Sequence, residues 1–204
     1  MSFPNYFSLI PPLTLRDPLA ELLGAAEGGL MTYRYEDAVK LAGHSCPTVA
    51  GAWLMAARGL AVLYPEPTLP ERGNIRVDLR EAEEAGTAGV VANVLGLITG
   101  AAGTGGFKGL AGRHVRRQLL HFGVEQAAQV RLTRLDTGAA VALDYDPDAV
   151  PPGPELAGLM PRVIGGTASP TELEAFGGLW QERVRRILID EAGNPDLITV
   201  WHAD

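Results

Sequence analysis

The spacing of hydrophobic positions predicts three main helices. Apolar side chains recur at helical spacing from Pro47 until a proline-rich stretch begins at Pro65, which is the pattern of a buried helix with proline in its first turn. Residues 89–99 are apolar on nearly every side and fit an interior helix or a strand, and we favour the helix. Residues 169–172 form a capping box, Ser-Pro-Thr-Glu, which opens a third helix with an apolar stripe that ends before Gly193. Shorter helices are expected after Asp17-Pro18 and over residues 35–41.

Alternating positions predict the strands. Residues 130–135 and 139–145 are two β-type runs joined by a short turn that contains Gly138, which predicts a hairpin. Residues 30–35, 74–78 and 196–201 are further strand candidates. Because the strands do not alternate regularly with the helices, we predict an α+β fold with a mixed or antiparallel sheet, a central buried helix and flanking helices.

The chain length predicts one domain with peripheral segments. The 204 residues suffice for one hydrophobic core, and four prolines within residues 147–154 indicate a linker. We therefore divide the chain into an N-terminal segment (1–34), an α+β core (35–148) and a C-terminal helical appendage (149–204). The long apolar stripe of the appendage must pack on the core or on a partner, and we expect a homodimer.

The charge and the cysteine content indicate which classes of partner and which cellular compartment to expect. The formal net charge of −7 argues against nucleic acid as the main partner. Neither of the longest apolar stretches reaches the ~18 to 20 residues of a membrane span, so no membrane association is expected. The chain has one cysteine and no basic region at its start, which favours a reducing, cytoplasmic location.

The segment Gly43-His44-Ser45-Cys46-Pro47 holds the only thiol, two residues from an imidazole and just before a helix. The N-terminus of a helix favours an anion, so this position favours the thiolate, and His44 and Cys46 could share a metal. The alternative is structural, with Cys46 as a small buried side chain and His44 as a hydrogen-bonded core residue.

A run of six glycines within residues 100–112 predicts a loop whose backbone can approach a ligand closely. Four cations fall within ten residues there, which suggests a cradle for a small anionic ligand; the alternative is a solvated basic face. No organic cofactor is expected, because the loop matches neither common phosphate-binding glycine motif. The candidate ligand-binding residues are Thr48, Asn93, Thr104, Gly105, Gly106, Lys108 and Arg113.

Gly43-His44-Ser45-Cys46-Pro47, preceded by Asp37 and followed by Ala50-Gly51-Ala52, resembles the signature of the FmdE-like family, which is named after an accessory subunit of formylmethanofuran dehydrogenase. Ile98-Thr99-Gly100, the glycine-rich loop and the hairpin with Thr137-Gly138 at its turn follow in the order that family uses. The resemblance covers roughly residues 35–147. Thr48 stands where many relatives have glycine, which suggests a divergent subgroup.

The resemblance implies an α+β core, a tendency to dimerise, and a divalent metal, usually zinc, held near His44 and Cys46. Ala101 and Ala102 follow Gly100 where relatives often carry cysteine, and the zinc finger that some relatives append is absent from this sequence. We therefore expect a protein that binds a metal or a small anion where the His44-Cys46 loop meets the glycine-rich loop. Two alternatives remain: a thiol enzyme with Cys46 as nucleophile and His44 as its proton-transfer partner, or a non-catalytic accessory subunit of a tungsten or molybdenum oxidoreductase.

Overall fold

The computed structural model describes residues 3–203 and the side chains of residues 3–201. Five strands form one sheet in the order β4-β3-β5-β6-β7, and a separate two-stranded pair lies apart from it. In the five-stranded sheet, β3 and β4 run parallel and the other neighbours run antiparallel. The strands of the sheet are β3 (Ile75–Leu79), β4 (Leu120–His121), β5 (Val130–Arg134), β6 (Ala140–Tyr145) and β7 (Ile198–Ala203), and the pair is β1 (Leu13–Arg16) and β2 (Leu30–Tyr33).

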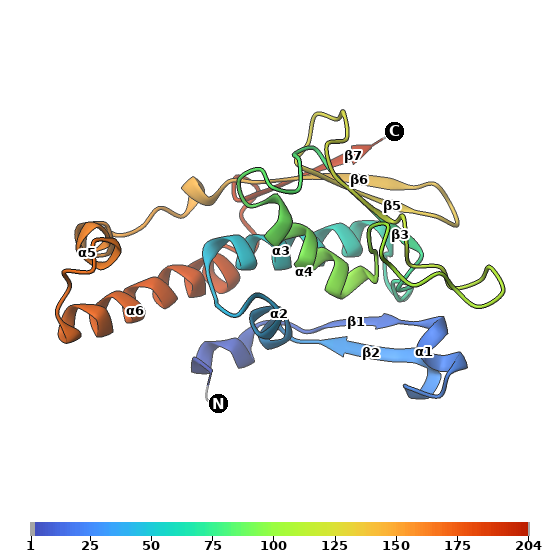
Figure 1. The fold of residues 1–204 in the computed structure, drawn as a ribbon, viewed down its shortest axis with the longest axis horizontal. Helices are drawn as coiled ribbons and strands as arrows, with labels where there is room; N and C mark the ends of the chain where they lie inside the picture. Colours follow the sequence, from blue (N-terminus) through green and yellow to red (C-terminus); the bar gives the residue numbers. More distant parts are fainter. Residues whose placement is uncertain (1–2, 204) are drawn as a thin grey trace.

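Helices cover one face of the sheet, so the predicted α+β fold with a mixed sheet and a central buried helix is confirmed (Figure 1). Two helices pack between the sheet and a further layer, which holds the β1–β2 pair (Figure 1). The helices are α1 (Pro18–Leu22), α2 (Tyr35–Ala42), α3 (Pro47–Leu63), α4 (Ala88–Thr99), α5 (Pro154–Ile164) and α6 (Pro170–Arg185), and a π-helical turn (Arg186–Asp190) continues α6.

Helix α3 is the central element of the core, and twelve of its seventeen residues are buried. Small residues let it approach the sheet closely: a Cβ added to Gly59 would lie 2.6 Å from Leu132 Cδ1 of β5. The opposite side of α3 packs on Tyr35 of α2, whose ring meets that of Trp53 edge to face. Burial of a side chain as large as Trp53, which is 1% exposed, makes this contact a main source of hydrophobic stabilisation.

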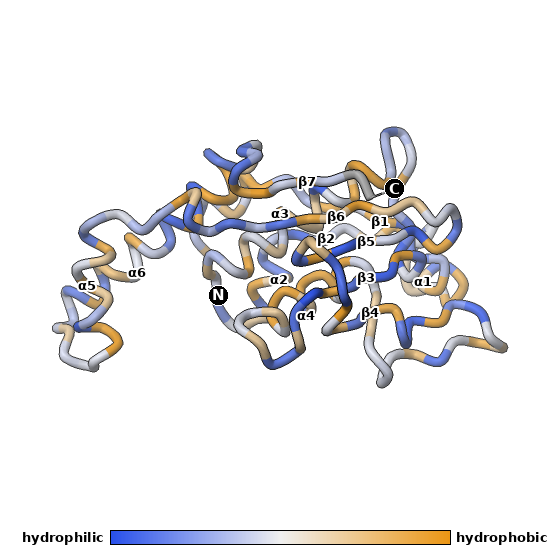
Figure 2. The backbone as a smooth tube through the Cα atoms, turned by 90° about the horizontal axis from the view of Figure 1, so that it is seen from above, coloured by the Kyte–Doolittle hydropathy of each residue, from blue (hydrophilic) through white to orange (hydrophobic). Residues whose placement is uncertain are grey.

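Helices α5 and α6 form a hairpin that projects away from the sheet in both views (Figures 1 and 2). Pro154 begins α5 and Ser169 caps α6 by accepting a hydrogen bond from the N–H of Glu172. The predicted helix from Ser169 is therefore present, whereas α5 lies in a stretch for which the sequence predicted no element. The apolar stripe of α6 changes along its length, since Val184 is buried against the body and Leu173, near the outer end, is 50% exposed.

Candidate functional site

The His44-Cys46 loop connects two helices. Helix α2 ends at Gly43, which adopts the left-handed conformation (φ +76°) that glycine tolerates best. Cys46 is the N-cap residue of α3 in extended backbone, and Pro47 takes the first helical position, where its missing N–H costs nothing. The sequence therefore fixes both ends of this short loop.

Residues distant in sequence hold the loop in place. The carbonyl oxygen of Ser45 accepts hydrogen bonds from Trp180 Nε1 (2.9 Å) and Gln181 Nε2 (3.2 Å), both on α6. The Ser45 hydroxyl lies 3.1 Å from the hydroxyl of Tyr35. Burial raises the pKa of Tyr35 far above its ordinary value, so this phenol stays protonated. The C-terminal helix thus contributes directly to the position of the loop.

Tyr145 of β6 stabilises the first turn of α3 from the other side. Its hydroxyl donates a hydrogen bond of 2.8 Å to the carbonyl oxygen of Pro47. Burial raises the pKa of Tyr145 and keeps the donor protonated. The ring lies directly against Gly51, where a Cβ would be 2.5 Å from Tyr145 Cδ1. Only glycine therefore permits this approach of helix and strand.

His44 and Cys46 differ in exposure. The thiol residue is 8% exposed, whereas His44 is exposed and its Nδ1 lies 2.9 Å from the carbonyl oxygen of Ala42. A carbonyl oxygen only accepts, so this hydrogen bond places the proton on Nδ1 and leaves Nε2 as an acceptor. Among the described residues, no three His, Cys, Asp or Glu side chains are grouped to hold a metal ion. The loop thus offers two possible metal ligands, His44 and Cys46, which is fewer than a zinc site requires.

Four of the seven predicted ligand-binding residues line two different cavities, and Gly106, Lys108 and Arg113 line neither. Thr48 lines a cavity of about 250 Å³ whose other walls include Met55, Leu79 and Val91. Asn93, Thr104 and Gly105 line a second cavity, of about 670 Å³, which we call the glycine-loop pocket. Its walls come from α4, the glycine-rich loop, β4, the residue after β4 and the segment between β3 and α4, and they comprise Glu83, Ala92, Asn93, Gly96, Ala101, Ala102, Gly103, Thr104, Gly105, Leu120, His121 and Phe122.

The loop of this pocket turns sharply, and the residues at its tip are exposed. The N–H of Gly106 donates to the carbonyl oxygen of Gly103 (3.1 Å), which leaves Thr104 and Gly105 exposed at the tip. A Cβ on Gly106 would lie 2.8 Å from the backbone nitrogen of Arg117, so glycine is required there by packing. Lys108 is exposed and outside the walls of the pocket.

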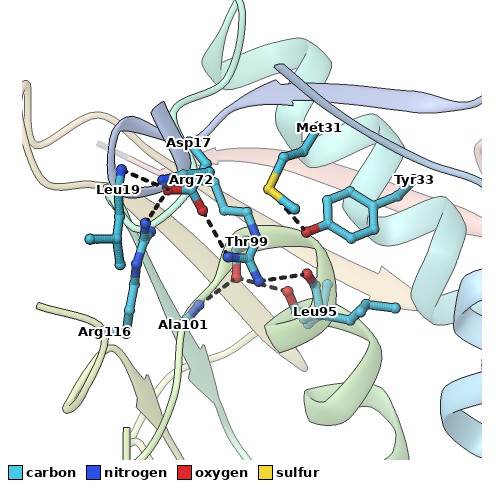
Figure 3. Close-up of polar contacts among 11 residues, drawn as sticks. Asp17, Leu19, Met31, Tyr33, Arg72, Leu95, Thr99, Ala101 and Arg116 are labelled. Carbon is cyan, nitrogen blue, oxygen red and sulfur yellow. Dashed lines mark hydrogen bonds and ion pairs between the residues drawn. The ribbon is translucent and has the colours of Figure 1, made fainter. Parts of the chain in front are cut away.

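Arg113, the last predicted ligand residue, is exposed and also lies outside those walls. Its neighbour Arg116 has a structural partner instead: its Nη2 lies 2.6 Å from Asp17 Oδ1, and Arg72 Nη1 lies 2.9 Å from Asp17 Oδ2 (Figure 3). Burial raises the pKa of Asp17, but hydrogen bonds from Arg72 and the N–H of Ala20, with the charge of Arg116, outweigh it and hold the pKa below its ordinary value. This cluster fixes the glycine-rich loop to the N-terminal segment.

The pocket contains two polar side chains that the sequence interpretation did not select, Glu83 and His121. His121 lines it, and its Nδ1 lies 3.0 Å from Oδ1 of Asp78, which is 3% exposed. The other oxygen, Asp78 Oδ2, accepts hydrogen bonds from Arg76 Nε (2.9 Å) and Arg131 Nη2 (3.2 Å). No local signal joins Asp78 to His121, because they are 43 residues apart and meet only through the parallel β3–β4 pairing.

Comparison with known proteins finds no matching family model and no similar curated protein. Among the described helices, none is both long enough and apolar enough to cross a membrane.

Proposed function

We propose that this protein binds a small anionic ligand in the glycine-loop pocket. The observation that carries the proposal is that Asn93, Thr104 and Gly105, which come from two separate segments, line one cavity. The side chains of Asn93 and Thr104 form no hydrogen bond with the part of the chain that the structure describes, so both are free to bind a ligand. Amide, hydroxyl and backbone N–H groups together are the donors that bind small oxyanions.

The charge around the pocket favours an anion. Residues 100–117 contain Lys108, Arg113, Arg116 and Arg117 and no carboxylate. Glu83 is the one carboxylate among the residues that line the pocket. Cations near a site raise the local concentration of anions even where they do not contact the ligand.

Titration of isotope-labelled protein with inorganic phosphate tests this proposal by NMR. We expect amide shifts at residues 93, 103–105 and 121, and at least about tenfold weaker binding for Thr104→Val, because a hydroxyl donor is replaced by an apolar group. Thr68→Val is the matched control, since Thr68 is exposed in a distant loop. Shifts confined to Lys108, Arg113 and Arg117 would place the anion on the basic surface instead, and no shift at all would exclude the site.

A second proposal concerns a divalent metal, with zinc expected, on His44 and Cys46. The resemblance to the FmdE-like family motivates it, and the free Nε2 of an exposed histidine fixed through Nδ1 favours it, because metal-binding histidines are commonly oriented this way. The remaining ligands would come from solvent or a second copy. Zinc content of purified protein should fall in His44→Ala and Cys46→Ser and persist in His114→Ala. Metal-free wild-type protein after zinc exposure would refute this proposal.

We further propose that two copies of the chain pair through the α5–α6 hairpin. Ile164 and Leu173 lie on this projecting arm and are 78% and 50% exposed, and exposed apolar surface on an arm of this kind is typical of an interface. Light scattering should give twice the 21.6 kDa of one chain. Ile164→Glu should shift the protein toward the monomer, whereas Leu22→Glu, which also replaces an exposed leucine, should not. A wild-type monomer would refute pairing.

A further inference from the structure

The hydrogen bonds around Asp78 determine where the proton of His121 lies. The Asp78 side chain is nearly inaccessible, and its Oδ2 accepts hydrogen bonds from two guanidinium groups, those of Arg76 and Arg131. A carboxylate only accepts hydrogen bonds, so Asp78 Oδ1 accepts the hydrogen bond that His121 Nδ1–H donates. In its neutral form, His121 therefore carries its proton on Nδ1, and Nε2 holds a lone pair.

Nε2 is the side-chain nitrogen of His121 that remains available to a ligand, because Nδ1 is bonded to Asp78. His121 is one of the residues that line the pocket, its side chain is 40% exposed, and Nε2 forms no hydrogen bond with any described residue. The same pocket presents donors at Asn93 and Thr104. A ligand that satisfies all of these groups must both accept hydrogen bonds and donate one.

We infer that the pocket selects a protonated oxyanion, such as hydrogen phosphate or a phosphate-type group that retains a proton, and that His121 accepts the hydrogen bond from its hydroxyl. The inference rests on the proposed function of the same pocket and specifies the class of ligand. Hydrogen phosphate carries one P–O–H donor, whereas sulfate has the same charge and similar size and no donor. Sulfate would place an oxygen lone pair against the lone pair of Nε2, which leaves this acceptor unpaired beneath the ligand and costs binding energy.

Asp78 is a positioning residue in this scheme, because it acts through the imidazole. An asparagine at position 78 could donate its amide N–H to Nδ1, which would move the imidazole proton to Nε2. The pocket would then present a donor where the wild-type protein presents an acceptor, and the preference between the two anions would reverse.

The test compares phosphate with sulfate at pH 8 and constant ionic strength, by calorimetry or NMR titration. We expect wild-type protein to bind phosphate about tenfold more tightly than sulfate, since an unmade hydrogen bond at an acceptor covered by the ligand typically has this effect. His121→Gln should abolish the preference, because an amide side chain can donate as well as accept. His114→Gln is the matched control and should retain the preference, since His114 lines a different cavity.

Two further variants make the outcome decisive. Glu83 also lines the pocket and its carboxylate is an acceptor, so a preference that disappears in Glu83→Gln and survives in His121→Gln would overturn the inference. In Asp78→Asn, the nitrogen chemical shifts of the imidazole should show the Nε2–H form, and sulfate should bind more tightly than to the wild type. If Asp78→Asn does not fold, the result for His121→Gln decides between the outcomes. Equal binding of both anions by the wild type would overturn the inference and leave the proposed function intact, whereas failure of both to bind would refute the proposed function itself.

Discussion

Replacement of Gly51 by alanine should destabilise the protein although it favours helix formation. Gly51 lies in the middle of α3, and the added Cβ would lie 2.5 Å from Tyr145 Cδ1 and 2.6 Å from Cζ. The ring cannot move aside easily, because Tyr145 is 8% exposed and its hydroxyl is bonded to the carbonyl of Pro47. Overpacking of this kind costs up to about 3 kcal/mol, and alanine recovers about 1 kcal/mol of helix propensity. We expect the free energy of unfolding to fall by about 2 kcal/mol.

Urea denaturation measures this change, and Gly177→Ala provides the matched control. Gly177 lies in the middle of α6 with no atom within 4 Å of an added Cβ, so the same substitution should stabilise the protein by up to about 1 kcal/mol. Because displacement of Tyr145 would loosen the start of α3, Gly51→Ala should also speed alkylation of Cys46. A variant Gly51→Ala as stable as the wild type would show that the helix and strand can separate freely and would refute the packing argument.

Two other substitutions test the contacts that hold the candidate loops. Asp17→Asn should lower the free energy of unfolding by about 3 kcal/mol at pH 7, because the buried guanidinium of Arg116 and the half-buried guanidinium of Arg72 lose their carboxylate. The folded-state pKa of Asp17 lies below its unfolded value, so its contribution is fully present above about pH 4 and is lost gradually as the pH falls toward the folded-state pKa. The difference in unfolding free energy between the two proteins should therefore be smaller at pH 3 than at pH 7, and a constant difference would contradict this. Trp180→Phe removes one hydrogen-bond donor to the carbonyl of Ser45 and should lower the free energy of unfolding by about 1 kcal/mol. It should also accelerate modification of Cys46 by a thiol reagent, and an unchanged rate would show that Trp180 does not position the loop.

Local signals in the sequence were sufficient for the elements with clear boundaries. Pro47 at the start of α3, the capping box at Ser169 and the Gly138 turn of the β5–β6 hairpin each act within a few residues, so no tertiary information is needed. Helix α5 was missed because Pro154 belongs to the proline-rich residues 147–154, which indicated a linker, although Pro154 occupies the first helical position and the helix also packs on α6. Whether such a segment forms a helix depends on its tertiary packing.

The candidate site also combines features with local sequence signals and features that depend on tertiary contacts. The motif around Cys46 and the glycine-rich loop are contiguous in sequence and were recognised directly. The pair of Asp78 and His121 depends on β4, a strand of two residues that pairs in parallel with β3. A strand so short has no alternation to detect, so the contact that fixes the imidazole tautomer becomes visible only in the folded chain.

The two segments outside the expected core each hold one of the candidate loops. Trp180 of the C-terminal helix donates to the carbonyl of Ser45, and Asp17 of the N-terminal segment pairs with Arg116. Arg116 in turn accepts a backbone hydrogen bond from Ala102 and donates one to Phe107, on the two arms of the glycine-rich loop. Both contacts join residues more than 90 positions apart. The geometry of each loop therefore depends on the folded state of a distant segment, so substitutions at positions 17 and 180 should alter ligand binding and thiol reactivity before they unfold the core.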